Sequence, residues 1–111
     1  MENFKKAMLE VGTISEMEGY GSRIFHHIKL NEDYRISIQC SASHYCTPRI
    51  LADIDAYTTY EVAIIGIDGF TYPKELDNFD RKEELDQCCS YGVFGYVPTD
   101  LVEDLFNFMK K

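Results

Sequence analysis

The segment Tyr57–Ile67 constrains the fold more strongly than any other part of the chain. It is rich in β-branched residues, and residues 62–65 are apolar without interruption. β-branched side chains favour strands, and an unbroken apolar run is typical of a strand that is buried on both faces. We therefore expect a central strand here. Asp68 and Gly69 then predict a turn, after which residues 70–72 are expected to pair back.

Two alternating segments predict an antiparallel hairpin on the N-terminal side of this strand. In Ser22–Leu30 the even-numbered residues are expected to share one face, with His26 half-buried and His27 exposed. In Tyr34–Ser41 the apolar face again falls on the even positions, and turn-forming residues separate the two segments. The polar, glycine-bearing stretch over residues 13–21 is expected to be a loop.

Helices are expected at both ends of the chain. Apolar residues recur at helical spacing over residues 2–11, and Gly12 can end that helix. At the other end, Asp100 and Glu103 resemble a capping box that would begin a helix. An apolar stripe over residues 101–109 continues it.

The remaining elements complete a fold class. A short helix is expected after Pro73, another over residues 81–88, and a strand over residues 93–97. The resulting order predicts an α+β fold, in which an antiparallel sheet of about four strands carries N- and C-terminal helices packed on it. A chain of 111 residues suits a single domain, residues 1–111.

The cysteines and the N-terminal sequence bear on the compartment. The opening MENFKKAMLEV has charges throughout and no apolar h-region, and no apolar run approaches the length of a membrane span. We therefore expect a cytoplasmic protein that acts in a host cell and does not bind membranes. Its cysteines are expected to be reduced thiols: Cys40, Cys46, Cys88 and Cys89.

The net charge of −8 is concentrated in the second half of the chain, where residues 53–104 hold thirteen acids and three bases. An acidic face repels nucleic acid phosphates and attracts basic protein surfaces, so we expect a basic protein partner and no direct contact with nucleic acid. A solvated helix face without a partner is the plainer alternative. The residues expected to bind the partner are Asp53, Asp55, Glu75, Asp77, Asp80, Glu83, Glu84 and Asp86.

The tract over residues 39–49 combines two thiols, an imidazole, a phenol and a guanidinium. One interpretation is a zinc site built from its cysteines and histidine with Cys88 and Cys89, but no C-x-x-C pair is present. A second is a thiol enzyme in which His44 or His27 activates Cys46. Neither pattern is specific, and no metal or cofactor is expected.

In a third interpretation, the residues of this tract only pack and hydrogen-bond within the fold. The same residues could alternatively form a ligand-binding loop. In that form, His44, Tyr45 and Arg49 line a pocket for a small molecule such as a signalling nucleotide. The aromatic ring would stack on a base and the arginine would hold a phosphate.

Two stretches resemble segments of small phage and mobile-element proteins. They are ISIQCSASHYCTPR, over Ile36–Arg49, and VFGYVPTDLVEDLFNFM, over Val93–Met109. The resemblance implies a place in phage–host conflict, where anti-CRISPR proteins are small, acidic and single-domain. Many of these dock an acidic face on the basic groove of an RNA-guided nuclease. The net charge of −8 is modest for a full nucleic-acid mimic, and no catalytic residue carries over.

Taken together, these features favour a non-enzymatic protein that inhibits a host nucleic-acid-handling defence protein through its acidic surface. The first alternative is a nucleotide-binding or sponge protein that uses the loop with His44, Tyr45 and Arg49. The second is a zinc or thiol enzyme. The apolar faces of the terminal helices would also suit a homodimer.

Overall fold

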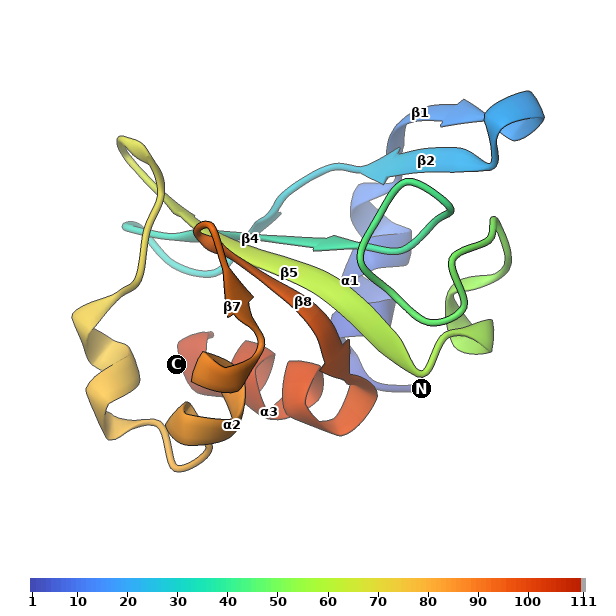
Figure 1. Ribbon diagram of the computed structural model, residues 1–111. Coiled ribbons are helices and arrows are strands. Elements are labelled where there is room, and N and C mark those ends of the chain that lie inside the picture. The colour runs from blue at the N-terminus through green and yellow to red at the C-terminus, as the bar shows by residue number, and fades with distance from the viewer. Residues whose placement is uncertain (111) are drawn as a thin grey trace.

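The computed structural model describes residues 1–110, which form an α+β fold as expected (Figure 1). The α-helices of this part of the chain are α1 (Asn3–Val11), α2 (Lys82–Gln87) and α3 (Thr99–Met109). Short 3-10 helices also occur: η1 (Glu18–Tyr20), η2 (Ile54–Ala56) and η3 (Lys74–Asn78). No helix within residues 1–110 has both the length and the apolar character needed to cross a membrane.

The main sheet is antiparallel and has six strands in the described residues rather than about four. Their order is β3-β4-β5-β8-β7, with β6 pairing on β5. The strands are β3 (Ile28–Lys29), β4 (Arg35–Gln39), β5 (Thr59–Gly66), β6 (Gly69–Phe70), β7 (Cys89–Ser90) and β8 (Val93–Pro98). A separate two-stranded sheet holds β1 (Thr13–Met17) and β2 (Ser22–Phe25).

The central position of β5 confirms the prediction made from its unbroken apolar run. In register, Ile64 pairs with Ile36 of β4 and Tyr60 pairs with Val97 of β8. The side chains of Val62, Ala63 and Ile64 are all buried, although neighbours on a strand point to opposite faces. The β5–β6 turn and its return strand are also confirmed, with Ile65 paired to Phe70.

Helices α1 and α3 contact each other and lie together behind the sheet in the view of Figure 1. Phe4 and Met8 of α1 and Leu101 and Leu105 of α3 are almost completely buried there. The Phe4 and Tyr60 rings pack in a T-shaped arrangement with their centroids 5.2 Å apart. The packing of both terminal helices on the sheet is therefore as expected.

The predicted capping box is wrong, because Glu103 caps the other terminal helix. Helix α3 begins at Thr99, with Pro98 at its N-cap and no side-chain cap. Glu103 then lies in the second turn and faces α1. Its carboxylate oxygens accept the backbone N–H groups of Asn3 at 2.8 Å and Phe4 at 3.1 Å. N–H groups at the start of a helix have no acceptor within that helix. The Glu103 carboxylate, which is about a hundred residues away in sequence, accepts these two.

The segment Ser22–Leu30 is two strands rather than one. Strand β2 pairs with β1, while β3 pairs with β4. The buried positions change from odd, at Arg23 and Phe25, to even, at Ile28, because residues 26–27 belong to neither ladder. His26 is consequently exposed, not half-buried, whereas His27 is exposed as predicted.

Residues 13–21 are also not the expected loop. They form β1 and then η1, and every residue of β1 is exposed. A strand that pairs without burying a face has no alternation between apolar and polar residues, so its sequence resembles that of a loop.

Replacement of Glu103 by alanine is expected to lower the free energy of unfolding by about 1 kcal/mol, because two N–H groups of α1 lose their acceptor. Urea denaturation followed by circular dichroism measures this change. Glu10→Ala is the matched control, since Glu10 is an exposed glutamate of α1, and we expect it to change stability by less than roughly 0.5 kcal/mol. Equal losses in the two variants would contradict the capping role.

Candidate functional site

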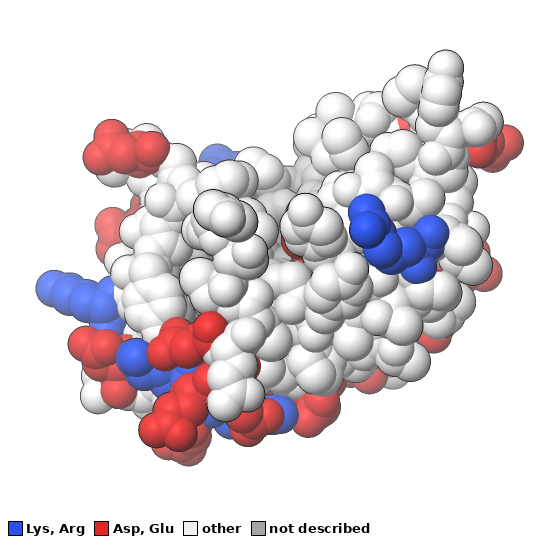
Figure 2. All heavy atoms as spheres, in the orientation of Figure 1, with Lys and Arg blue, Asp and Glu red and all other residues white. Residues whose placement is uncertain are grey.

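Six of the eight expected partner-binding acids lie together on η3, on α2 and in the turn between them, and we call this group the acidic surface. Figure 2 shows acidic side chains, with cationic ones among them, gathered at the lower left, where Figure 1 places these elements. Leu76 and Leu85 anchor η3 and α2 in the core and leave the acids outside. The acidic surface consists of Glu75, Asp77, Asp80, Glu83, Glu84 and Asp86, all exposed.

Asp53 and Asp55 do not join the acidic surface. They flank Ile54 on η2, which lies at the opposite end of the molecule, in light green at the right of Figure 1. Asp55 also accepts a hydrogen bond of 2.8 Å from the buried ammonium group of Lys5. The two parts of the predicted binding face, six acids and two, are thus separated by the length of the sheet.

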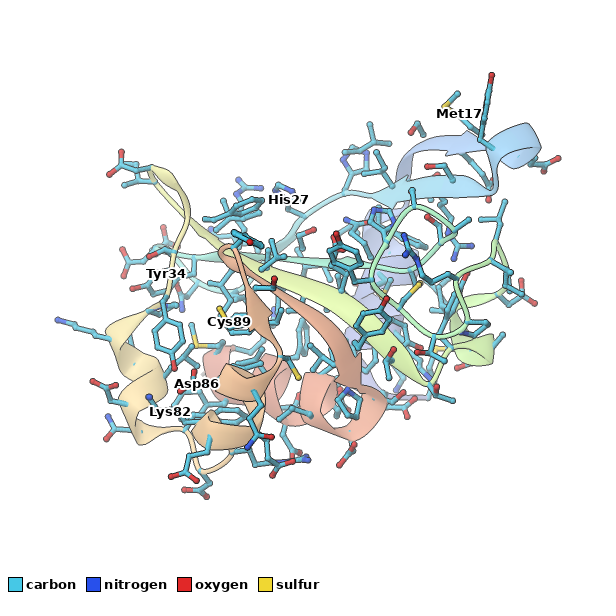
Figure 3. All side chains as sticks on the ribbon, viewed as in Figure 1. Met17, His27, Tyr34, Lys82, Asp86 and Cys89 are labelled. Carbon is cyan, nitrogen blue, oxygen red and sulfur yellow. The ribbon has the colours of Figure 1, made fainter. Side chains whose placement is uncertain are left out.

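Part of the acidic surface is neutralised by its own cations. Arg81 pairs with Glu84 at 2.7 Å. Lys82 pairs with Asp86 at 3.0 Å, and Figure 3 labels both residues. The bonds from Arg81 lower the pKa of Glu84, and the hydroxyl of Tyr72, which donates to Asp86 at 2.6 Å, lowers the pKa of that carboxyl. Both acids are therefore ionised, but each already faces a partner.

Arg81 also fixes α2 against α3. Its guanidinium contacts Asp104 at 2.9 Å and Asp100 at 3.0 Å, in addition to Glu84. The hydrogen bond to Glu84 is the main reason that the pKa of Arg81 is raised, so this side chain remains a cation. The acidic surface is consequently held on the C-terminal helix rather than on a free loop.

Three carboxylates of the acidic surface have no such neutralisation. Asp77, Asp80 and Glu83 make no ion pair and no side-chain hydrogen bond within residues 1–110. Glu75 accepts only a hydrogen bond of 3.3 Å, from the hydroxyl of Tyr34. These four side chains are the negative charges that this surface can offer to a partner.

In the loop after β4, the predicted ligand-binding residue His44 has a hydrogen-bond partner within the loop itself. The Nδ1 atom of His44 lies 2.8 Å from the hydroxyl of Ser41, and the imidazole is half-buried. Burial lowers the pKa of His44, so the ring is mainly neutral at pH 7. The structural interpretation therefore fits His44, which holds the loop in shape.

Tyr45 and Arg49 do come together, and Tyr96 of β8 joins them. The Arg49 guanidinium carbon lies 5.4 Å from the centre of the Tyr45 ring, and the Tyr45 and Tyr96 rings are 5.9 Å apart. Both tyrosines are about half exposed. We call Arg49, Tyr45 and Tyr96 the aromatic stack.

A β-bulge builds the aromatic stack and explains why sequence alone missed Tyr96. The register against β5 shifts by one residue at Gly95 and Tyr96, and Tyr96 has a φ of 54°. Bulges redirect side chains, and Tyr96 donates its backbone N–H to the carbonyl oxygen of Tyr45 at 2.9 Å. A Cβ at Gly95 would lie 3.1 Å from that of Tyr45, so this glycine was the available signal of a close approach.

The cysteines are spread over different environments. Cys40 and Cys46 are almost completely buried, which raises the pKa of Cys40 to about 12 and also raises that of Cys46. A nucleophilic cysteine requires the opposite shift. Cys88 is half-buried at the end of α2, and Cys89 is exposed on β7. Within residues 1–110, no three His, Cys, Asp or Glu side chains are grouped closely enough to hold a metal ion.

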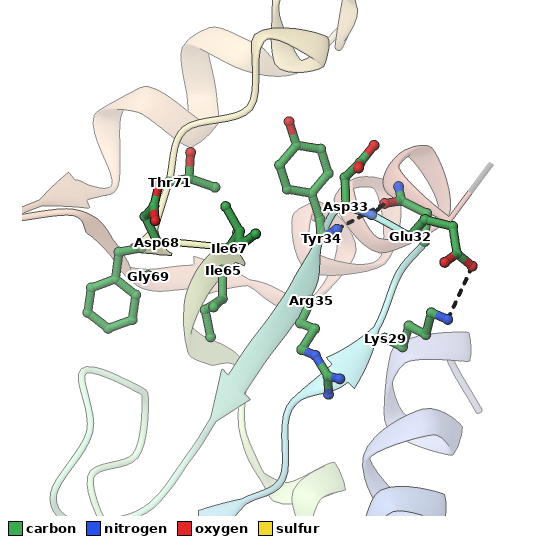
Figure 4. A pocket seen from close by; sticks show the side chains of 13 residues that line it. Lys29, Glu32, Asp33, Tyr34, Arg35, Ile65, Ile67, Asp68, Gly69 and Thr71 are labelled. Atoms are coloured by element: carbon green, nitrogen blue, oxygen red, sulfur yellow. Dashed lines mark hydrogen bonds and ion pairs between the residues drawn. The ribbon is translucent and has the colours of Figure 1, made fainter.

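One open groove lies where the β3–β4 turn faces the β5–β6 turn (Figure 4). Its volume is about 670 Å³. Lys29 and Arg35 supply positive charge, while Glu32, Asp33 and Asp68 supply negative charge. Lys29 and Glu32 already pair with each other at 3.3 Å. This mixture favours no particular ligand charge, so the groove carries no functional assignment.

Alkylation with iodoacetamide at pH 8 is expected to modify Cys89 first and Cys40 last. Cys89 is exposed, whereas burial both blocks Cys40 and suppresses its thiolate by raising its pKa to about 12. Peptide mass spectrometry over time measures the order. The unfolded protein in urea serves as the control, in which all the cysteines should react at similar rates. Rapid labelling of Cys40 or Cys46 in the folded protein would instead support a reactive thiol.

Comparison with known proteins finds no matching family model, no matching curated protein and no matching solved structure. The resemblance of residues 36–49 and 93–109 to phage proteins is therefore neither supported nor opposed by these comparisons. Function has to be inferred from the side chains of this chain and their arrangement.

Proposed function

We propose that the protein acts by binding and not by catalysis, through docking of its acidic surface on a basic surface of a protein partner. The observation behind this proposal is a set of carboxylates that have no cationic partner among the described residues and lie on segments packed against α3. Asp77, Asp80 and Glu83 have no cationic partner, while Arg81 ties the same elements to α3. Charges that are fixed in place before binding steer association and lose little freedom on docking.

The partner that best complements this surface is a protein with a basic groove for nucleic acid. Such grooves carry closely spaced Lys and Arg side chains, which a row of carboxylates can occupy in place of phosphates. The phage-protein resemblance points in the same direction, to an anti-CRISPR-like inhibitor of a host defence nuclease. Asp53 and Asp55 are not part of this proposed interface, since they lie at the other end of the molecule.

Neutralising the acidic surface is expected to abolish capture of a basic nucleic-acid-binding protein from host lysate. The variant combines Glu75→Gln, Asp77→Asn, Asp80→Asn and Glu83→Gln, which remove the free charges and leave the Arg81 contacts intact. Capture by the unmodified protein should also weaken steeply as salt rises, because its attraction is screened. Pull-down with salt steps and mass spectrometry measures both effects.

A matched control removes four exposed acids from other places on the molecule. It combines Glu10→Gln, Glu18→Gln, Asp33→Asn and Asp68→Asn, which gives the same change in net charge. We expect this control to bind like the unmodified protein. Equal loss in both variants would mean that overall charge, and not the acidic surface, is responsible. Normal capture by the first variant would rule out the interface.

A second candidate function is binding of a planar, anionic small molecule such as a nucleotide. It is favoured by the aromatic stack, in which Tyr45 and Tyr96 are half exposed and Arg49 lies over the Tyr45 ring. A base can stack on an exposed tyrosine, and a guanidinium can hold a phosphate. This version of the site does not use His44, whose Nδ1 atom is hydrogen-bonded to Ser41.

Under this second candidate, Arg49→Ala is expected to weaken nucleotide binding by roughly tenfold or more, through loss of a charge-assisted hydrogen bond. Isothermal titration calorimetry with linear and cyclic adenine and guanine nucleotides measures the affinity. Arg35→Ala is the control, since Arg35 is an exposed arginine on β4, outside the loop that holds Arg49. Affinity that stays unchanged in Arg49→Ala would exclude the aromatic stack as the binding site.

A further inference from the structure

Arg23 is a buried cation without a carboxylate partner. Its side chain comes from β2, and the residue is only 8% exposed. One terminal nitrogen donates to the carbonyl oxygen of Cys40 at 2.9 Å and lies 3.4 Å from the hydroxyl of Tyr57. The guanidinium also lies 4.9 Å from the centre of the Phe25 ring. Among residues 1–110, no Asp or Glu oxygen comes within 4 Å of it.

The Nε atom of Arg23 is the buried polar side-chain atom of the described residues that has no hydrogen-bond partner. An unpaired buried donor is costly, and more so when it belongs to a charged group. Arginine forms paired hydrogen bonds with planar oxyanions, for which Nε–H is one of the natural donors. Arg23 therefore keeps a positive charge that no carboxylate among residues 1–110 neutralises and a buried donor that none of them satisfies.

Arg23 forms part of the wall of an open pocket of about 440 Å³, within the usual range of small-molecule sites; we call it the Arg23 cavity. This Arg23 cavity lies where α1, β1, β2 and η2 meet. Leu9, Phe25 and Ile54 give it apolar walls. Glu16, Asp53 and Asp55 add carboxylates to the same lining.

Two of these carboxylates remain free to meet a ligand. Lys5 neutralises Asp55 at 2.8 Å and also pairs with Glu2 at 3.0 Å. Glu16 and Asp53 make no ion pair within residues 1–110. Glu16 lies directly opposite Arg23 in the β1–β2 register, yet the two side chains do not pair. The cavity thus presents separate positive and negative groups to whatever enters it.

From this arrangement we infer that the Arg23 cavity binds a small zwitterion, an α-amino acid with an apolar side chain. The ligand carboxylate accepts hydrogen bonds from the part of the Arg23 guanidinium that lines the cavity. The ligand ammonium faces Glu16 and Asp53, and the side chain packs on Leu9, Phe25 and Ile54. A phosphate fits less well, because two negative charges would face these acids, and a simple cation would leave Arg23 unpaired.

Nuclear magnetic resonance titration with L-leucine tests the assignment on the intact protein. The Nε–Hε signal of Arg23 and the backbone amides of Gly12, Thr13 and Ile54 report on the cavity. We expect saturable shifts, largest at Arg23. Leucinol lacks the carboxylate and N-acetyl-leucine lacks the ammonium, and each should bind roughly tenfold more weakly or worse. Absence of leucine binding up to its solubility limit, or tighter binding of inorganic phosphate than of leucine, would overturn the inference.

A variant separates the two charged contacts. Asp53 is exposed and makes no side-chain hydrogen bond in the described residues, so Asp53→Asn should fold normally. It is expected to weaken binding of leucine but not of N-acetyl-leucine, which has no ammonium group. Asp33→Asn, on a distant turn, is the matched control and should bind leucine normally. Equal leucine affinity in Asp53→Asn and the unmodified protein would remove the ammonium contact and with it the zwitterion assignment.

Discussion

Strand β5 is hydrogen-bonded along both edges, and the positions of the other elements follow from it. It pairs with β4 on one side and β8 on the other, and its end folds back through β6. Tyr60 of β5 connects these layers, because its ring meets Phe4 of α1 and its hydroxyl donates to the carbonyl oxygen of Ile54 on η2. The same strand thus fixes the helix layer and one wall of the Arg23 cavity.

Charged side chains divide into those that hold the fold together and those that remain available. Glu103 joins α3 to the start of α1, Arg81 joins α2 to α3, and Lys5 joins α1 to η2. All three contacts link segments that are distant along the chain, so they act as ties between layers. Asp77, Asp80 and Glu83 have no comparable contact. An acidic composition alone does not distinguish these two uses of charge.

Sequence patterns predicted the elements whose signal is local. The apolar run in β5 and the stripe on α3 each carry their own burial pattern, and the acids of residues 75–86 stay together because they are close in sequence. Features that depend on distant partners were missed. Strand β1 pairs without burial, the two strands around His26 belong to different sheets, and Glu103 caps a helix almost a hundred residues away. The burial of Arg23 likewise depends on Cys40 and Tyr57.

The small sheet of β1 and β2 is an arm separate from the main sheet. The Arg23 cavity forms where this arm meets α1 and η2. All side chains of β1 are exposed, so Arg23 and Phe25 of β2 are the arm's main buried attachments. An element with so little buried area opens at a much lower free energy than the whole protein. Opening of the arm would return the guanidinium to water and remove the cavity. A molecule bound to Arg23 would therefore stabilise the closed arm. Its binding would slow amide hydrogen exchange in β1 and β2.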